Sequence, residues 1–188
     1  MATLSRQDAD WSLDGTKRGW SIRATPATLC RVTLGAFVLI LVTNTSADPD
    51  LWGHLRFGLD MLASKSIHSA DLYSFTADRV WINHEWLAEL LMGIGYTGLG
   101  ALGLNLLKLV VVAVVGGIAL VIARQEHASP IARDVYVALT VFATYSRTQA
   151  IRPQMFSVAI FCAMLYLLRE TGRGRPRALW YLPLFFVA

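Results

Sequence analysis

Residues 109–123 read LVVVAVVGGIALVIA, fifteen residues in a row without a polar side chain. A helix on the surface of a soluble protein keeps one polar face, so a helix that is apolar all round belongs in a membrane or deep in a large core. With the apolar residues before it, the run extends over 101–123, and a helix needs about 20 residues to cross a bilayer. The stretch therefore predicts a membrane-spanning helix.

The composition of the whole chain agrees with a membrane protein. Of its 188 residues, 55% are hydrophobic and 16% are charged, whereas soluble domains carry about 25% charged residues. The net charge is +4, but the arginines lie in short clusters between apolar runs. Such clusters indicate membrane topology rather than contact with a phosphate backbone, so we expect no nucleic-acid partner. Cys30 and Cys162 lie in apolar segments and have neither a metal-binding spacing nor a disulfide framework around them.

Four further apolar runs predict helices in the membrane, at 27–46, at 132–147, at 153–168 and from 178 onward. The last run reaches Ala188 after about half the length of a span, so we expect the chain to be the N-terminal portion of a longer protein. Residues before the first span are polar, and no signal-peptide cleavage site follows that span. The expected organisation is a cytoplasmic tail over 1–26 and a transmembrane domain over 27–188.

The segment 84–98 can either span the membrane or lie flat on its surface, because Glu85 and Glu89 give it a polar face. If it spans, seven Lys and Arg residues lie in segments on the cytoplasmic side of the membrane and nine lie in segments on the outer side. If it lies flat on the outer side, the counts become eleven inside and five outside. The positive-inside rule favours the second arrangement. We therefore predict an all-α fold, a polytopic transmembrane helix bundle, with a large outer loop at 47–100.

That outer loop concentrates the polar chemistry, with seven of the thirteen acidic residues and three of the four histidines. It begins DPDLWGHLRFG (48–58), followed by an amphipathic helix over 50–64, and 84–98 forms its second juxtamembrane helix. Asp48 stands where a helix N-cap would and Asp50 just behind it, so Asp48 can simply cap the helix and Asp50 can simply complement the helix dipole. Alternatively, they act as a general base on an acceptor hydroxyl or hold a divalent cation such as Mg²⁺ or Mn²⁺.

Four other residues of the loop are candidates for substrate binding. His54 can orient an acid or touch a phosphate, although a histidine there can also be a solvated interface residue. Arg56 follows it two positions later and carries a positive charge. His84 and Glu85 form half of a metal motif, but no second histidine follows at helical spacing.

Three basic residues face the same outer side in this topology. Arg147 and Arg152 lie in SRTQAIRPQ (146–154), the short turn between two predicted spans, and Lys108 lies about two turns inside a span. A cation at that depth is costly unless it snorkels to the headgroups or meets an anion. A phosphate on a lipid carrier would satisfy all three side chains.

The stretches DPDLWGHLRFG (48–58), IHSADLYSFT (67–76) and VWINHEWLAE (80–89) resemble the outer loop of bacterial integral-membrane glycosyltransferases of the type C superfamily. These enzymes are relatives of protein O-mannosyltransferases and of the enzyme that adds aminoarabinose to lipid A. The resemblance covers about residues 30–170. It departs from the family after Arg147, where relatives commonly carry an aspartate and this chain reads RTQAIRPQ.

The resemblance implies a multi-pass protein of the bacterial inner membrane, with a cytoplasmic N-terminus and membrane lipids around it. The implied activity moves a sugar from a polyprenyl-phosphate donor to a glycan, lipid or protein acceptor on the outer face. Asp48 or Asp50 would match the catalytic acidic motif, and Arg147 matches an arginine at the outer end of a span. One carboxylate would take the acceptor proton, while basic residues stabilise the leaving phosphate.

Two other interpretations remain open. The chain can be a fragment of a transporter or flippase in which Lys108, Arg147 and Arg152 line a path for an anion. It can also be a truncated, non-catalytic relative that binds a carrier lipid or a partner. The sequence contains no inverted repeat of the kind that would favour transport.

Overall fold

The computed structural model describes residues 25–67, 69–70, 73, 75 and 81–186. Helices make up 78% of the structure, and seven lie in the part that is described. The expected all-α class is confirmed at this level. The expected cytoplasmic tail, 1–26, lies outside the described residues apart from its last two positions.

Among the described residues, three helices are long and apolar enough to cross a membrane: α1 (Pro26–Thr43), α4 (Ala101–Gln125) and α6 (Gln154–Gly172). They coincide with three of the predicted spans. The most apolar stretch of α1 has no buried residue, so its side chains stay at least partly exposed even where α1 packs against α5. Helix α1 begins where Thr25 Oγ1 accepts a hydrogen bond from the Thr28 amide at 3.2 Å, with Pro26 in the first turn.

The predicted span at 132–147 forms helix α5 (Pro130–Thr148), but α5 is not among the three candidate spans. The physical reason is its composition, since α5 carries Arg133, Asp134 and Arg147. Asp134 Oδ2 lies 3.0 Å from Arg31 Nε of α1, and α5 packs against both α1 and α4. Helix α5 therefore belongs to the bundle, with its N-terminal charge paired to a neighbouring helix.

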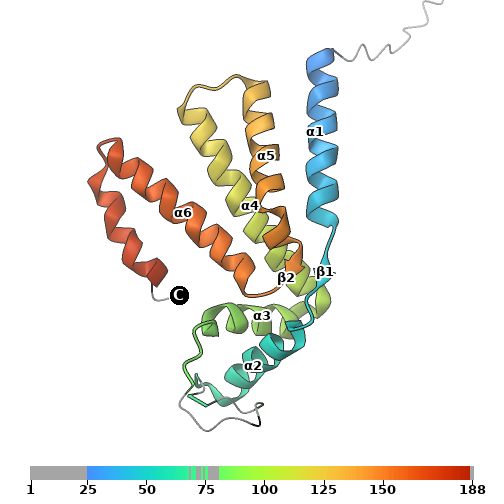
Figure 1. Ribbon diagram of the computed structural model, residues 1–188, viewed down its shortest axis with the longest axis vertical. Helices are drawn as coiled ribbons and strands as arrows, with labels where there is room; N and C mark the ends of the chain where they lie inside the picture. Colours follow the sequence, from blue (N-terminus) through green and yellow to red (C-terminus); the bar gives the residue numbers. More distant parts are fainter. Residues whose placement is uncertain (1–24, 68, 71–72, 74, 76–80, 187–188) are drawn as a thin grey trace, which may run out of the picture.

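Helices α2 (Leu51–Ser64) and α3 (Trp86–Leu99) lie across one end of the longer helices and pack against each other (Figure 1). Their crossing depends on glycine, because a Cβ atom on Gly58 would lie 2.1 Å from the Glu89 carbonyl oxygen. At 14 residues, α3 is only about 21 Å long, shorter than a bilayer core of about 30 Å. Gly100, with φ +59°, then turns the chain directly into α4.

Two short strands were not predicted. β1 (Ser46–Ala47) follows α1, and β2 (Ala150–Ile151) joins α5 to α6. They pair in parallel, with Ser46 opposite Ala150 and Ala47 opposite Ile151. Through this strand pair, the segment after α1 is hydrogen-bonded to the turn between α5 and α6.

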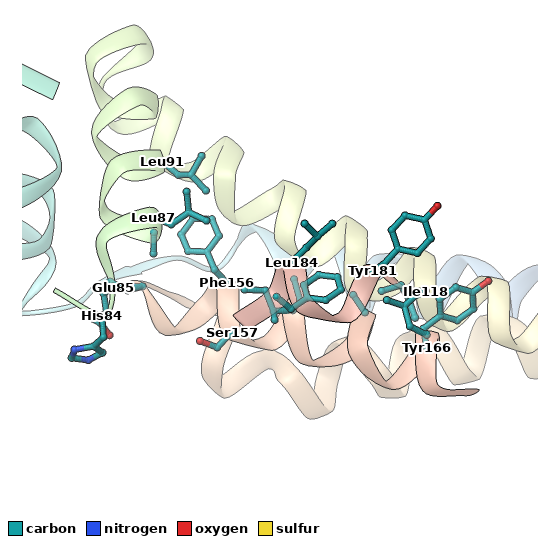
Figure 2. A pocket seen from close by; sticks show the side chains of 17 residues that line it. His84, Glu85, Leu87, Leu91, Ile118, Phe156, Ser157, Tyr166, Tyr181 and Leu184 are labelled. Carbon is teal, nitrogen blue, oxygen red and sulfur yellow. The ribbon is translucent and has the colours of Figure 1, made fainter. Parts of the chain in front are cut away.

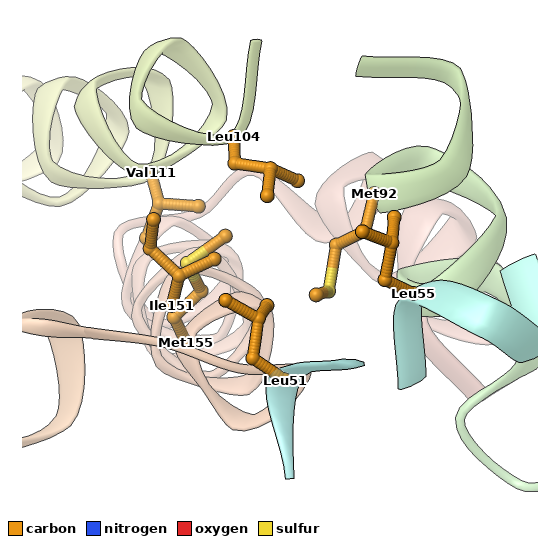
Figure 3. Packing of buried hydrophobic residues seen from close by; sticks show 7 residues of the cluster. All are labelled: Leu51, Leu55, Met92, Leu104, Val111, Ile151 and Met155. Atoms are coloured by element: carbon orange, nitrogen blue, oxygen red, sulfur yellow. The ribbon is translucent and has the colours of Figure 1, made fainter. Parts of the chain in front are cut away.

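The largest cluster of buried apolar residues lies where α2 and α3 meet the ends of the longer helices (Figure 3). Its members are Leu51, Leu55, Met92, Leu104, Val111, Ile151 and Met155. Because these side chains come from α2, α3, α4, β2 and α6, the core holds the surface helices in place on the bundle.

The far end of the bundle is held by ion pairs between α4 and α6. Arg173 Nη1 lies 2.9 Å from Glu126 Oε1, and Arg169 donates to the same carboxylate. The hydrogen bond from Arg169 lowers the pKa of Glu126. Beyond α6, the 3₁₀ helix η1 (Pro176–Phe186) covers the segment that was predicted to start a further span, and it packs back against α6 (Figure 1).

Candidate functional site

Asp48 and Arg152, both predicted as site residues, form an ion pair at the end of the bundle that carries α2 and α3. Arg152 Nη2 lies 2.8 Å from Asp48 Oδ2, and the Asp48 side chain is 10% exposed. The pair exists because β1 and β2 run side by side and are followed directly by these two residues. Sequence reasoning placed both residues on the same side of the membrane but not in contact.

Asp48 is not the N-cap of α2, as the sequence had suggested it could be. Helix α2 begins at Leu51, so Asp50 occupies the cap position, where its side chain makes no cap hydrogen bond. Asp48 Oδ1 instead accepts a hydrogen bond from the Asp50 amide at 3.0 Å, two residues on, which is the geometry of an Asx turn. The Asp50 side chain stays exposed.

This arrangement does not favour the Mg²⁺ or Mn²⁺ ion that was left open as one alternative for Asp48 and Asp50. These ions need a shell of several oxygen ligands. One oxygen of Asp48 accepts from the Asp50 amide and the other contacts the positive Arg152 guanidinium. The carboxylate is therefore already compensated by a side chain.

A second polar cluster joins α2 to α3. His54 Nδ1 lies 2.9 Å from Glu89 Oε1 and 3.4 Å from Glu85 Oε2. The Glu89 side chain is 2% exposed, and its other oxygen accepts a hydrogen bond from Asn83 Nδ2 at 2.6 Å. His54 and Glu85 were predicted as separate binding residues, and the packing of the two helices brings them together.

The surroundings of His54 favour its protonated form. The pKa of His54 is raised, chiefly by the hydrogen bond to Glu89. Burial opposes this shift, while the charges of Glu85, Glu89 and Asp50 add to it. The contribution of Asp50 links this cluster electrostatically to the loop that carries the Asp48–Arg152 pair.

Sequence reasoning missed Glu89 and Asn83 as site residues. The spacing of Glu85 and Glu89 indicated a polar face of α3, but the partner of that face was unknown until α2 was placed against it. Gln154, the first residue of α6, was also missed. Its Nε2 donates a hydrogen bond to Glu85 Oε1 over a distance of 3.2 Å. Only the positions of α2 and α6 reveal these contacts.

Arg56 does not join either cluster. Its Nη2 lies 3.1 Å from Asp60 Oδ1, one helical turn further along α2, and its Nε donates to the Tyr73 hydroxyl at 2.8 Å. Arg56 therefore faces the loop after α2. The structure gives it a local role beside Asp60 and Tyr73.

Lys108 is 1% exposed and is held at the end of α1. Its Nζ donates to the Asn44 carbonyl at 3.0 Å and to Thr45 Oγ1, while the Asn44 side chain donates to the Tyr145 hydroxyl at 2.6 Å. These two oxygens accept hydrogen bonds from two of the three N–H donors of the buried ammonium group. Arg147 is exposed and makes no side-chain ion pair or hydrogen bond with another described residue.

A cavity of about 600 Å³ lies beside the polar clusters, between α3, α4, α6 and η1. Most of its lining is apolar, including Leu87, Leu91, Ile118, Phe156, Ile160 and Leu184. His84 and Glu85 lie at one end, and Tyr166 and Tyr181 lie toward the other (Figure 2). Glu85 thus belongs to both the cavity and the His54 cluster, and Pro153 of the lining directly follows Arg152.

The site combines an apolar cavity with a carboxylate and a histidine at its polar end, Glu85 and His84. No protein-family model, curated protein or solved structure matches this chain. The arrangement suits a ligand with a long apolar part and a polar or anionic head. An exposed carboxylate and a guanidinium at such a head can transfer a proton and stabilise negative charge, respectively.

The Asp48–Arg152 pair should stabilise the end of the bundle that carries α2 and α3. We expect Arg152→Gln to destabilise the folded protein by about 1 to 2 kcal/mol, because it leaves a mostly buried carboxylate without its cation. Thermal unfolding in detergent measures the change, and Arg147→Gln, an exposed arginine in the preceding helix, serves as the matched control. In a double-mutant cycle with Asp48→Asn, additive effects would contradict the pairing.

Proposed function

We propose that this protein transfers a sugar from a polyprenyl-phosphate carrier to an acceptor on the outer face of the bacterial inner membrane. The observation that carries the proposal is the 600 Å³ apolar cavity, which has His84 and Glu85 at its polar end and is lined by Pro153, the residue after Arg152. A polyprenyl tail requires an apolar site, and its phosphate requires a cation nearby. The cavity offers the apolar site, and Arg152 is the proposed cation.

The distribution of charge supports the membrane orientation. The start of α1, the turn between α4 and α5, and the end of α6 lie at the end of the bundle opposite α2 and α3 (Figure 1). The arginines in these segments and just after them are Arg31, Arg124, Arg133, Arg169, Arg173, Arg175 and Arg177. By the positive-inside rule, this distribution supports an orientation with this end in the cytoplasm and with α2 and α3 along the outer surface.

In the proposed reaction, the bond between the sugar's anomeric carbon and the carrier phosphate breaks as the acceptor oxygen attacks. Asp50, which is exposed, takes the proton from the acceptor hydroxyl. The bonding electrons leave with the phosphate oxygen, and Arg152 stabilises its negative charge. Asp48 holds the Arg152 guanidinium by an ion pair, and exposed Arg147 lies in the same turn region as a second cation for the phosphate.

A transfer assay tests the proposal. The purified full chain, in nanodiscs, is given a panel of radiolabelled polyprenyl-phosphate sugars and a membrane extract as acceptor, and the label that moves to the acceptor is measured. Transfer from at least one donor is expected. Carrier binding without transfer from any donor would support a non-catalytic carrier-binding protein instead, and the absence of both would overturn the proposal.

Carrier binding should depend on the free volume of the cavity. Ala163 lines the cavity from α6, so Ala163→Phe places a ring in the space of the tail. We expect this substitution to weaken binding of a labelled carrier about tenfold or more, which corresponds to about 1.4 kcal/mol. Ala143→Phe, at an exposed position on α5, is the control. Equal carrier affinity in both variants would place the tail elsewhere.

A further inference from the structure

The cluster of His54, Glu85 and Glu89 has more negative charge than its side chains compensate. His54 Nδ1 faces an oxygen of each glutamate, at 2.9 Å and 3.4 Å, yet one nitrogen carries at most one proton. Within the described residues, no lysine or arginine forms an ion pair with either glutamate. Glu89 is almost fully buried, and a buried charge is costly unless it is compensated. The cluster is therefore short of positive charge.

The spacing of the three side chains suits a metal ion. One ligand atom from each residue lies within 4.8 Å of the others. In a tetrahedral Zn²⁺ site, with bonds of about 2.0 to 2.1 Å, neighbouring ligand atoms lie about 3.3 Å apart. The two measured distances from His54 Nδ1 lie on either side of that value.

Each glutamate turns one oxygen toward His54, while its second oxygen accepts a hydrogen bond from an amide. Asn83 Nδ2 donates to Glu89 Oε2 at 2.6 Å, and Gln154 Nε2 donates to Glu85 Oε1 at 3.2 Å. Asn83 is itself buried and fixed, because its Oδ1 accepts from the Glu85 amide at 3.0 Å. Such amide contacts to the outer oxygens orient metal-binding carboxylates.

We propose that His54, Glu85 and Glu89 bind one divalent transition-metal ion, with Zn²⁺ as the best match. One imidazole nitrogen and two carboxylate oxygens are ligands that Zn²⁺ accepts, and three protein ligands leave a fourth position for water. The ion replaces the proton between His54 and the glutamates and supplies the missing positive charge. It also joins α2 to α3 beside the cavity. The proposal does not depend on sugar transfer, since metal binding is measured directly.

Zinc binding to the purified full chain in detergent tests the proposal. The protein is stripped with a chelator, incubated with Zn²⁺, passed through a gel-filtration column and analysed for metal by mass spectrometry. We expect one zinc ion per chain. Glu85→Gln and His54→Gln are each expected to weaken zinc affinity about tenfold or more, because each removes a ligand. These two side chains are 22% exposed, and circular dichroism verifies that the variants remain helical.

His84→Ala is the matched control, because His84 is exposed, lies next to Glu85 in the chain and does not contact the cluster. Its zinc affinity should equal that of the unsubstituted protein. Failure of the unsubstituted protein to retain zinc would overturn the proposal and leave the cluster as an ion pair of protonated His54. Equal zinc affinity in all three variants would also overturn it. Either failure leaves the transfer assay unaffected, so the two proposals are judged separately.

Discussion

Asp50→Asn is expected to lower the rate of sugar transfer by a factor of about 10² to 10⁴, the usual contribution of a general base. Asparagine keeps the size of the side chain but cannot accept the proton of the acceptor hydroxyl. Because Asp50 is exposed and makes no cap hydrogen bond in α2, the substitution should leave the fold unchanged. Initial rates with a radiolabelled donor, together with carrier affinity, measure the effect.

Asp60→Asn provides the control for that experiment. Asp60 lies in the same helix but pairs with Arg56, away from the cavity. Its transfer rate should match that of the unsubstituted protein. If Asp50→Asn retains full activity while Asp48→Asn loses it, Asp48 is the base and the assignment of Asp50 is wrong. Loss of carrier affinity in Asp50→Asn would likewise contradict a role confined to proton transfer.

Gly103→Val is expected to prevent stable packing of α3 on α4. A Cβ atom on Gly103 would lie 1.9 Å from the Gly95 carbonyl oxygen and 2.5 Å from its carbon. These are backbone atoms that cannot rotate away, so the helices must separate. Overpacking of this kind costs about 1 to 3 kcal/mol, and the two methyl groups on the valine Cβ add to it. Melting temperature and the yield of monodisperse protein in detergent measure the loss.

Gly117→Ala tests whether that effect comes from the helix crossing or from glycine in a helix. Gly117 lies in the same helix, and no atom lies within 4 Å of a Cβ placed on it. Alanine favours a helix over glycine by about 1 kcal/mol, so this variant should be as stable as the unsubstituted protein or more stable. An unchanged melting temperature in Gly103→Val would show that the close approach of α3 and α4 is not required.

Local patterns were sufficient to locate the helices. The apolar runs behind α1, α4 and α6 are continuous, and the amphipathic period of α2 lies within a single segment, so each can be recognised without its neighbours. The segment of α5 was correctly predicted to be helical. Its expected role as a span was not confirmed, because three charged residues, Arg133, Asp134 and Arg147, make α5 too polar to count among the candidate spans.

The contacts of the site could not be read from local patterns. The Asp48–Arg152 pair depends on strands of two residues each, which have too few positions for any hydrophobic period. The contact between His54 and Glu89 depends on the Gly58 crossing, which becomes visible only when both helices are present. The contact of Lys108 with the Asn44 carbonyl was not predicted either, because that carbonyl lies past the end of α1 and belongs to a segment far from Lys108 in the sequence.

The pairing of β1 with β2 also orders events during biosynthesis. Ser46 leaves the ribosome long before its partner Ala150, about a hundred residues later, a delay of about 5 to 20 s at usual synthesis rates. During that interval Asp48 still lacks Arg152. The end of the bundle that carries α2 and α3 is therefore completed only after α5 has been made, and any nascent chain that stalls earlier carries an unpaired carboxylate there.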